Sequence, residues 1–187
     1  MVKKNTLPAK GKILIAEPFM KDPYFKRSVV ILADHNENGS FGFMLNKAIE
    51  LELKSAIANF PEYEDSLYLG GPVGTDQLFY IHTEGNRIPQ SIEITEGLWW
   101  GGDFKILKAI IRRGEIENNQ IRFFVGYAGW DPKQLEKEMK ENSWIVANPV
   151  IDLLMNPSTS VLWTKAIQSL GGEYKLMANY PEDPQLN

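Results

Sequence analysis

The apolar residues of this chain fall mostly into short runs bounded by turn residues, a pattern that predicts β-strands. The run at 29–33 is apolar at every position and rich in β-branched residues, which indicates a strand covered on both faces. Asn38-Gly39 suits a tight turn with positive φ, so a β-hairpin with the run at 41–45 is expected. Further strands are predicted at 13–16, 67–69, 78–82, 121–125 and 144–147, with a weaker one around Ile92 and Ile94.

Apolar residues at helical spacing predict four helices. They cover 53–60 before Pro61, the segment from Asp103 to Gly114, the segment opened by Asp131-Pro132, and a last helix that ends at Gly171-Gly172. Asp103 is a suitable N-cap, and Gln134 occupies the glutamine position of a capping box begun by Asp131. Strands joined partly by hairpins and partly through helices imply an α+β fold, a large mixed β-sheet with helices packed on it.

The chain is expected to form a single compact domain at residues 11–178, with a flexible N-terminal arm at 1–10 and a frayed tail at 179–187. No internal repeat or long linker divides it. A chain of 187 residues buries roughly 70% of the surface that its unfolded form exposes, so its stability needs neither a disulfide nor a metal.

Composition then narrows the chemistry. Cysteine is absent, which excludes disulfides, thiolate zinc sites and cysteine nucleophiles, and only His35 and His82 can transfer protons near neutral pH. The net charge of −4 argues against a protein that binds nucleic acid over its whole surface. No apolar run has the length of a signal-peptide core or a membrane helix, so we expect a cytoplasmic protein without a membrane partner. No metal or cofactor is expected.

Two glycine-rich junctions follow apolar runs, Gly70-Gly71-Pro72-Val73 and Gly126-Tyr127-Ala128-Gly129-Trp130. Small residues let the backbone approach either a neighbouring strand or a bound molecule, and α/β proteins place ligands at strand ends. The first junction lacks the lysine of a P-loop and the glycine spacing of a dinucleotide fold, and Pro72 removes a donor. A structural turn is therefore favoured there over a phosphate cradle.

The segment Asp34-His35-Asn36-Glu37-Asn38-Gly39 matches the first half of a calcium loop, but Leu45 replaces the glutamate that should close the loop. A polar hairpin turn is predicted instead. Ser40 lacks the glycine spacing of a nucleophile elbow, which argues against a serine hydrolase. His35 and Asn46 lie near the two ends of the hairpin. Either they line a pocket as a polar pair or, as we prefer, Asn46 turns the chain while His35 bonds backbone groups.

A second candidate surface is basic. Lys105, Lys108, Arg112 and Arg113 share the solvent side of the helix that begins at Asp103. Cations beside the aromatic pair Trp99-Trp100 could bind phosphates and stacked bases. Cations near a helix end also complement its dipole, and tryptophans beside glycines usually pack, so nucleic acid contact is an alternative rather than the first expectation.

Five ordered motifs resemble the bacterial YqgE/AlgH family from residue 11 to the last helix. They are Ile15-Ala16-Glu17-Pro18; residues 22–30; His35, Gly39, Gly42 and Leu45-Asn46-Lys47; Gly70-Gly71-Pro72-Val73; and the second glycine junction with Gln134-Leu135-Glu136, Glu138 and Trp144. The resemblance implies a complex α+β fold around a large mixed sheet. It brings the description of a transcriptional regulator, and no enzymatic activity, cofactor or defined binding site. Asp131-Pro132-Lys133 departs from the small, glycine-containing step of the family.

These observations favour a regulatory or binding protein without catalytic activity, which binds a small molecule or a protein in a groove where three segments meet. The candidate groove residues are His35, Asn46, Gly70, Gly71, Tyr127, Trp130 and Gln134. One alternative is a regulator that binds nucleic acid directly through the basic helix. The other is a small-molecule hydrolase or transferase with His35 as its base, which requires a partner group within hydrogen-bond reach.

Overall fold

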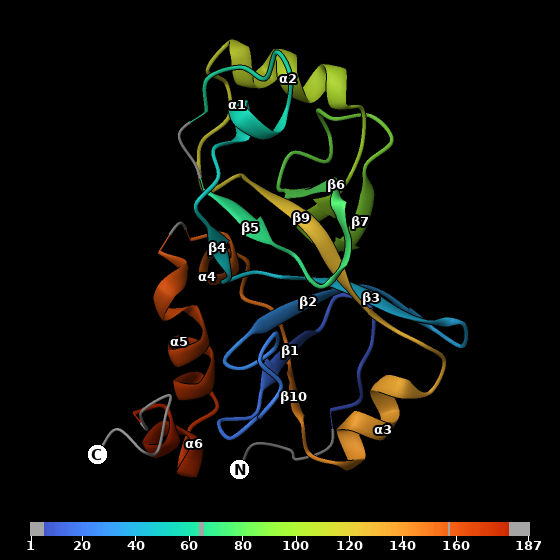
Figure 1. Ribbon diagram of the computed structural model, residues 1–187, viewed down its shortest axis with the longest axis vertical. Coiled ribbons are helices and arrows are strands. Elements are labelled where there is room, and N and C mark those ends of the chain that lie inside the picture. The colour runs from blue at the N-terminus through green and yellow to red at the C-terminus, as the bar shows by residue number, and fades with distance from the viewer. Residues whose placement is uncertain (1–5, 64–65, 157, 180–187) are drawn as a thin grey trace.

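The structure, a computed structural model, describes residues 6–63, 66–156 and 158–179 (Figure 1). In this part of the chain ten strands form one sheet, in the order β10-β1-β2-β3-β9-β6-β8-β7, with β5 beside β9 and β4 beside β5. The strands are β1 (Ile13–Ala16), β2 (Val29–Asn36), β3 (Gly39–Met44), β4 (Ala48–Ile49), β5 (Leu67–Leu69), β6 (Val73–His82), β7 (Ile92–Thr95), β8 (Leu98–Trp100), β9 (Ile121–Trp130) and β10 (Trp144–Ala147). β5 runs parallel to β9 and the other pairs are antiparallel, so the predicted mixed sheet is confirmed.

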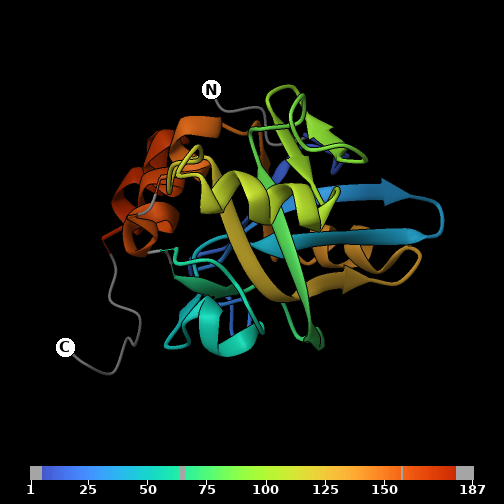
Figure 2. The same cartoon turned by 90° about the horizontal axis from the view of Figure 1, so that it is seen from above.

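Helices cover both ends of the molecule. They are α1 (Leu53–Ala56), α2 (Phe104–Arg112), α3 (Gln134–Lys140), α4 (Ile151–Leu154), the 3-10 helix Thr159–Val161, α5 (Leu162–Ser169) and α6 (Gly172–Met177). Figure 1 shows α1 and α2 at one end and α3, α5 and α6 at the other, and Figure 2 shows α2 lying across the sheet. The predicted α+β class and single compact domain are confirmed.

Buried side chains form two clusters, and β9 contributes to both. Adjacent residues of a strand point to opposite faces of the sheet. Phe123 accordingly packs in the cluster beneath α2, with Leu107 and Ile110. Phe124 belongs to the larger cluster, which also takes in the buried side chains of β1, β2 and α5. β9 is therefore the central strand of the molecule, and its register positions everything that lies beside it.

Arg122 of β9 is a charged side chain inside this core, 1% exposed. Its guanidinium lies 4.9 Å from the centre of the Tyr68 ring. It donates hydrogen bonds to the carbonyl oxygens of Leu45 (3.1 Å), Leu154 (2.6 Å) and Asn156 (2.8 Å). Since Leu154 ends α4, these bonds tie the C-terminal segment to the centre of the sheet.

Of the two predicted helix caps, one is present as predicted and the other is only partly formed. Asp103 accepts hydrogen bonds from two backbone N–H groups of the first turn of α2, at 2.8 and 3.1 Å, as predicted. α3 begins only at Gln134, because Lys133 adopts the left-handed conformation with φ of 65°. The capping box is half formed, since the N–H of Asp131 donates to Oε1 of Gln134 at 3.0 Å.

Some helices and strands begin or end at other residues than the apolar pattern predicts. The helix predicted at 53–60 ends at Ala56, because Ile57 is extended and Asn59 has φ of 56°. β9 does not end before the second glycine junction but continues through it to Trp130. The short elements β4, β8, α4 and α6 have no clear sequence signal.

At the two ends of the chain, the structure describes part of the predicted arm and tail. Pro8 is buried, and the N–H of Lys12 donates to the carbonyl oxygen of Ala9 at 3.1 Å. The tail at 180–187 lies outside the described residues.

Candidate functional site

The two glycine junctions pack against each other. A Cβ placed on Gly126, whose φ is +69°, would lie 2.5 Å from the carbonyl oxygen of Gly71. A Cβ on Gly70 or Gly71 would overlap backbone atoms of Gly126 or Tyr127 in the same way. The atoms that these glycines approach are therefore backbone atoms of the other junction, and the contact holds the segment between β5 and β6 against β9.

Because β9 continues through the second junction, its side chains alternate between two faces there. Tyr127 and Gly129 face one side, and the buried Trp130 faces the other. The β2–β3 hairpin pairs with this end of β9, with Phe41 opposite Gly129 and Ser40 opposite Trp130. β6 lies along the other edge of β9, so three strands meet around one surface.

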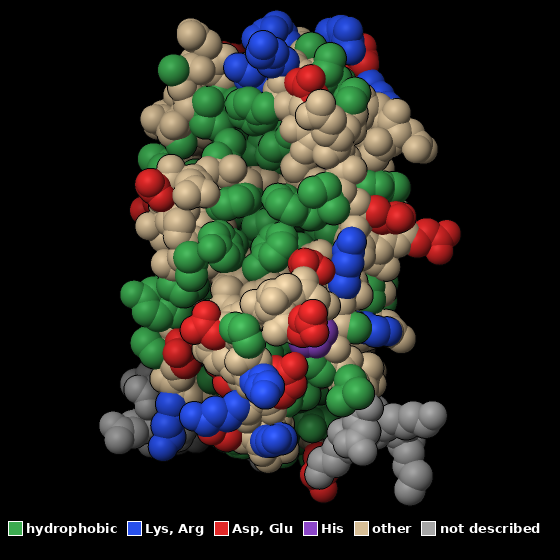
Figure 3. All heavy atoms as spheres, turned by 90° about the vertical axis from the view of Figure 1, so that its right-hand side faces the viewer, with side chains coloured by type: hydrophobic (Ala, Val, Ile, Leu, Met, Phe, Trp, Pro, Cys, Tyr) green, Lys and Arg blue, Asp and Glu red, His purple; other side chains and the backbone are tan. Residues whose placement is uncertain are grey.

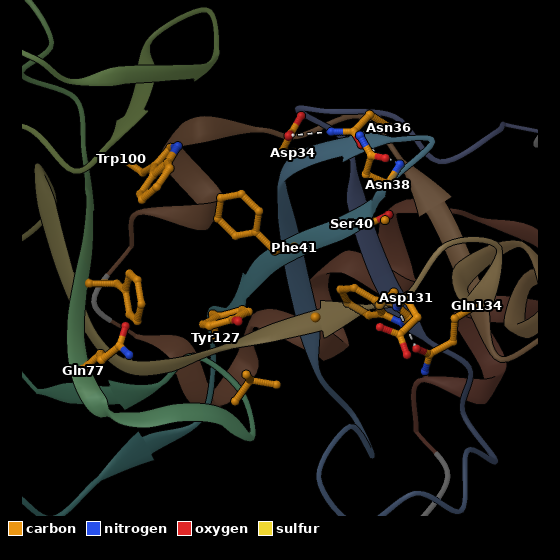
Figure 4. A pocket seen from close by; sticks show the side chains of 15 residues that line it. Asp34, Asn36, Asn38, Ser40, Phe41, Gln77, Trp100, Tyr127, Asp131 and Gln134 are labelled. Carbon is orange, nitrogen blue, oxygen red and sulfur yellow. Dashed lines mark hydrogen bonds between the residues drawn. The ribbon is translucent and has the colours of Figure 1, made fainter.

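A hollow of about 680 Å³ lies on this surface, and we call it the groove (Figure 4). Its described lining residues are Asp34, Asn36, Asn38, Gly39, Ser40 and Phe41 from the hairpin, Val73, Gln77 and Phe79 from β6, Trp100 from β8, Tyr127, Gly129 and Trp130 from β9, and Asp131 and Gln134 beyond it. In Figure 4 the labelled rings gather at one end, and most of the labelled polar side chains lie toward the other.

The apolar end of the groove consists of four half-buried aromatic side chains, Phe41, Phe79, Trp100 and Tyr127. The Phe41 ring stands nearly perpendicular to the rings of Trp100 (77°, centroids 5.2 Å apart) and Tyr127 (82°, 6.1 Å). Phe79 meets Tyr127 at 75° and 5.6 Å. Edge-to-face packing of this kind is favourable, and it turns the ring faces in different directions.

The polar end contains Asp34 and Asp131, the only charged side chains among the described lining residues. Oδ1 of Asp34 accepts the backbone N–H of His35 and Oδ2 accepts the side-chain amide of Asn36, both at 2.9 Å. Gln134 donates from Nε2 to Glu138 at 2.9 Å. These bonds hold the side chains of the polar end, which forms the rim of the groove, in place.

Three of the predicted groove residues line this hollow, namely Tyr127, Trp130 and Gln134. The other four, His35, Asn46, Gly70 and Gly71, are not among its described lining residues. Asn46 accepts the N–H of Val29 at 2.9 Å and donates to the carbonyl oxygen of Arg27 at 2.8 Å, so it fixes the chain ahead of β2.

His35 has a side-chain partner across the hairpin. Its Nδ1 lies 2.6 Å from Oγ of Ser40, which lines the groove. A histidine nitrogen at this distance from a hydroxyl is the arrangement that activates a serine nucleophile. The carboxylate of Asp34, however, bonds the backbone of His35 and the amide of Asn36.

His82, the other histidine, is fully buried. Burial lowers its pKa, and this effect exceeds the opposing effects of the hydrogen bond to Gly101 and of the nearby Glu84. Nδ1 accepts the backbone N–H of Glu84 at 3.2 Å, which leaves Nε2 to carry the proton and donate it to the carbonyl oxygen of Gly101 at 3.0 Å. Oγ of Ser91 lies 3.1 Å from the same Nε2. A nitrogen that carries a proton cannot accept one from Ser91, so this pair is structural.

Sequence reasoning missed most of the aromatic end of the groove. Phe41 and Phe79 lie in apolar runs that predict strands without marking either ring as a site residue, and Trp100 precedes a glycine pair. The available signal was strand alternation, since Phe41 follows the polar Ser40 and lies on the opposite face. Which face stays open depends on the pairing of β3, β6 and β8 around β9.

The described residues offer neither a metal site nor a membrane-spanning helix. They contain no group of three or more His, Cys, Asp or Glu side chains that could hold a metal ion. None of the helices in this part of the chain is both long and apolar enough to cross a membrane.

The predicted basic surface lies on α2. Lys105 and Arg112 are exposed, whereas Nζ of Lys108 lies over the Phe104 ring at 5.3 Å. Nε of Arg113 forms an ion pair with Glu115 at 2.8 Å. Figure 3 shows Lys and Arg side chains gathered at this end of the molecule and a band of hydrophobic side chains below them.

Comparisons with known proteins cover nearly the whole chain. A UPF0301 protein of Cytophaga hutchinsonii is 44% identical over 179 residues, which cover 95% of this chain and 98% of the relative. A UPF0301 protein of Bacteroides fragilis is 45% identical over 184 residues, covering 98% and 93%.

Two solved structures have the same fold. The solution structure of the AlgH protein from Pseudomonas aeruginosa superposes with a TM-score of 0.72 at 29% identity, over 95% of this chain and 97% of that one. The crystal structure of a Corynebacterium diphtheriae protein superposes with a TM-score of 0.80 at 22% identity, over 94% of each chain.

The AlgH-like family matches residues 13–175, a span that runs from β1 into α6 and contains every described residue of the groove. Relatives at more than 40% identity cover the same elements. The chain therefore belongs to the AlgH-like family, as its glycine junctions and hairpin motif indicate.

Proposed function

We propose that this protein is a regulatory or binding protein without catalytic activity and that the groove is its ligand site. The observation that carries the proposal is the set of four half-buried aromatic side chains at one end of a 680 Å³ hollow with a polar rim. Ligand sites are typically hollows of roughly 300–1,000 Å³ lined by apolar and aromatic side chains with a few polar groups. A ligand that covers these rings removes their apolar surface from water, and this burial contributes favourable hydrophobic free energy to binding.

A substitution that fills the groove tests the proposal. Gly129 lines the groove, and the heavy atoms nearest a Cβ placed there belong to side chains, Cε2 of Tyr127 at 3.2 Å and a methyl group of Val73 at 3.8 Å. The side chain of Gly129→Leu therefore fills groove space without a backbone clash at its Cβ. Glu136→Leu is the matched control, because it adds the same side chain at an exposed position of α3 outside the groove.

The experiment is a thermal-shift screen of nucleotides, central metabolites and small aromatic compounds against the three proteins. A ligand at a hundred times its Kd stabilises by about 2.7 kcal/mol, which raises Tm by roughly 5–10 °C in a domain of this size. We expect ligands that shift the wild type and Glu136→Leu but not Gly129→Leu. Ligands that stabilise Gly129→Leu as strongly as the wild type would place the site elsewhere.

A second candidate function is acyl transfer, favoured by the 2.6 Å separation of His35 Nδ1 and Ser40 Oγ. It ranks below binding because Asp34 is engaged by the backbone and by Asn36 rather than by the imidazole. Labelling with a fluorophosphonate distinguishes the two functions. Labelling of Ser40 that is lost in both Ser40→Ala and His35→Gln would support catalysis, whereas unlabelled wild type would exclude an activated serine.

Direct binding of nucleic acid through α2 is the other alternative, supported by the exposed Lys105 and Arg112. The groove is preferred because Lys108 lies over the Phe104 ring, Arg113 pairs with Glu115, and the chain has a net charge of −4, all of which weaken the attraction of α2 for phosphate groups.

A further inference from the structure

We propose that the groove selects ligands in which a cationic group is attached to an apolar, preferably aromatic, body. The inference rests on the proposed function, because it assumes that the groove is a ligand site. Asp34 and Asp131 contribute carboxylates to the described lining, and no Lys, Arg or His contributes a side chain there. The charge of the site is therefore complementary to a cation and repels phosphates and carboxylates.

The aromatic end favours a cation for a second, independent reason. The face of an aromatic ring carries partial negative charge, and an ammonium within about 6 Å of a ring centre is attracted to it. Phe41 stands nearly perpendicular to both Trp100 and Tyr127, and all three half-buried rings line the groove, so the groove is bordered by rings of different orientation. Sets of aromatic side chains with this arrangement are known to bind alkylated ammonium groups.

The apolar body has room beside the same rings. A second hollow of about 380 Å³ continues toward the start of α2, and it shares Phe79 and Trp100 with the groove. Among its other lining residues is Tyr80, whose hydroxyl donates to the carbonyl oxygen of Gly102 at 2.7 Å. Burial raises the pKa of Tyr80 to about 12, so this hydroxyl stays protonated and adds no negative charge. The ligand therefore places its cation between the carboxylates and the rings of Phe41 and Tyr127, which lie nearest the polar end in Figure 4, and its apolar part toward β8.

Three water-soluble probes with the same ring test the inference: benzyltrimethylammonium, benzyl alcohol and benzoate. Each is titrated into the protein while the backbone amide signals of β3 and β9 are followed by NMR. We expect benzyltrimethylammonium to bind about fivefold more tightly than benzyl alcohol, and benzoate to bind most weakly. The advantage of the cation should shrink as salt is added, because the carboxylates lie near solvent.

Variants that replace the carboxylates by amides test whether the preference for the cation comes from Asp34 and Asp131. In the double variant Asp34→Asn/Asp131→Asn, the advantage of the cation should fall to about twofold, the part that the rings alone provide. Asp152→Asn is the matched control, since it removes one carboxylate at an exposed position of α4 outside the groove, and it should leave the advantage unchanged.

The outcomes separate the two proposals. If the alcohol or benzoate shifts the groove amides as tightly as the cation does, the selectivity for cations is wrong and the groove remains a ligand site. If all three probes shift only amides outside the groove, the proposed function itself is wrong.

Discussion

Among single residues, Glu138 joins α3 to one tryptophan at the end of β9 and one at the start of β10. Its Oε2 accepts the indole N–H groups of Trp130 (2.9 Å) and Trp144 (2.7 Å), and both indoles are buried. Glu138→Ala leaves two buried donors without this acceptor, so we expect the free energy of unfolding to fall by about 2–4 kcal/mol. Urea denaturation followed by tryptophan fluorescence measures the change. Glu136→Ala, at an exposed position, should alter it by less than about 0.5 kcal/mol, and equal effects would contradict the argument.

The buried His82 makes stability depend on pH. Its pKa in the folded protein lies below the usual 6.5, mainly because burial disfavours the charged form. Below pH 6.5 the unfolded chain therefore binds more protons than the folded one, and stability falls as the pH drops from 6.5 through the folded pKa. One proton limits the slope to about 1.4 kcal/mol per pH unit.

Urea denaturation of the wild type, His82→Gln and His35→Gln between pH 7.5 and 5 checks this expectation. The decline below pH 6.5 should be reduced in His82→Gln and preserved in His35→Gln. An unchanged decline in His82→Gln would assign the effect to other groups.

At the scale of elements, the contact between the two glycine junctions leaves no space for an added methyl group. Gly126→Ala combines a positive φ with a clash against backbone atoms of Gly71 and Val73. Gly97 has a similar φ of +80° but no heavy atom within 4 Å of its Cβ position. We expect Gly97→Ala to destabilise the protein by about 1–2 kcal/mol, the cost of the left-handed conformation alone, and Gly126→Ala by clearly more. If thermal denaturation showed equal losses of stability in the two variants, β9 would have moved to accommodate the added methyl group, and the clash argument would be wrong.

The same elements explain how much of the structure the sequence could predict. The Asn38-Gly39 turn, the Asp103 cap and the apolar runs predict the β2–β3 hairpin, α2 and most strands, because each depends on neighbours in the chain. The continuation of β9 through Gly126 depends instead on a contact with Gly71, far away in sequence. The rings of the groove come together only through that pairing, so the sequence pointed to Tyr127 but not to Phe79.

At the scale of the whole molecule, the acidic groove, the apolar surface and the basic helix α2 follow one another along the molecule. The acidic rim of the groove, the four rings and the second hollow lead toward α2, where the basic side chains begin. In Figure 3 a hydrophobic band lies below the Lys and Arg side chains of the α2 end, and the lower part of this face carries acidic and basic side chains together. This arrangement predicts that groove ligands and polyanions engage separate surfaces.

Nucleic acid binding by α2 tests that separation. The chain carries a net charge of −4, and Glu115 pairs with both Arg113 and Arg87, which reduces the charge free to meet phosphates. At physiological salt we expect affinity for short DNA or RNA no tighter than about 10⁻⁵ M, the range of non-specific contact, falling steeply as salt increases. Fluorescence anisotropy with labelled DNA and RNA measures it.

The double variant Arg112→Glu/Arg113→Glu should abolish this residual binding and leave the thermal shift by groove ligands unchanged. Both residues lie at the end of α2 and outside the groove lining, so the reversal alters the polyanion surface alone. Binding tighter than about 10⁻⁶ M that the reversal removes would exceed what a few phosphate contacts provide, and it would make α2 a specific nucleic acid surface. Tight binding that survives the reversal would instead require a cationic surface elsewhere on a molecule whose net charge is negative.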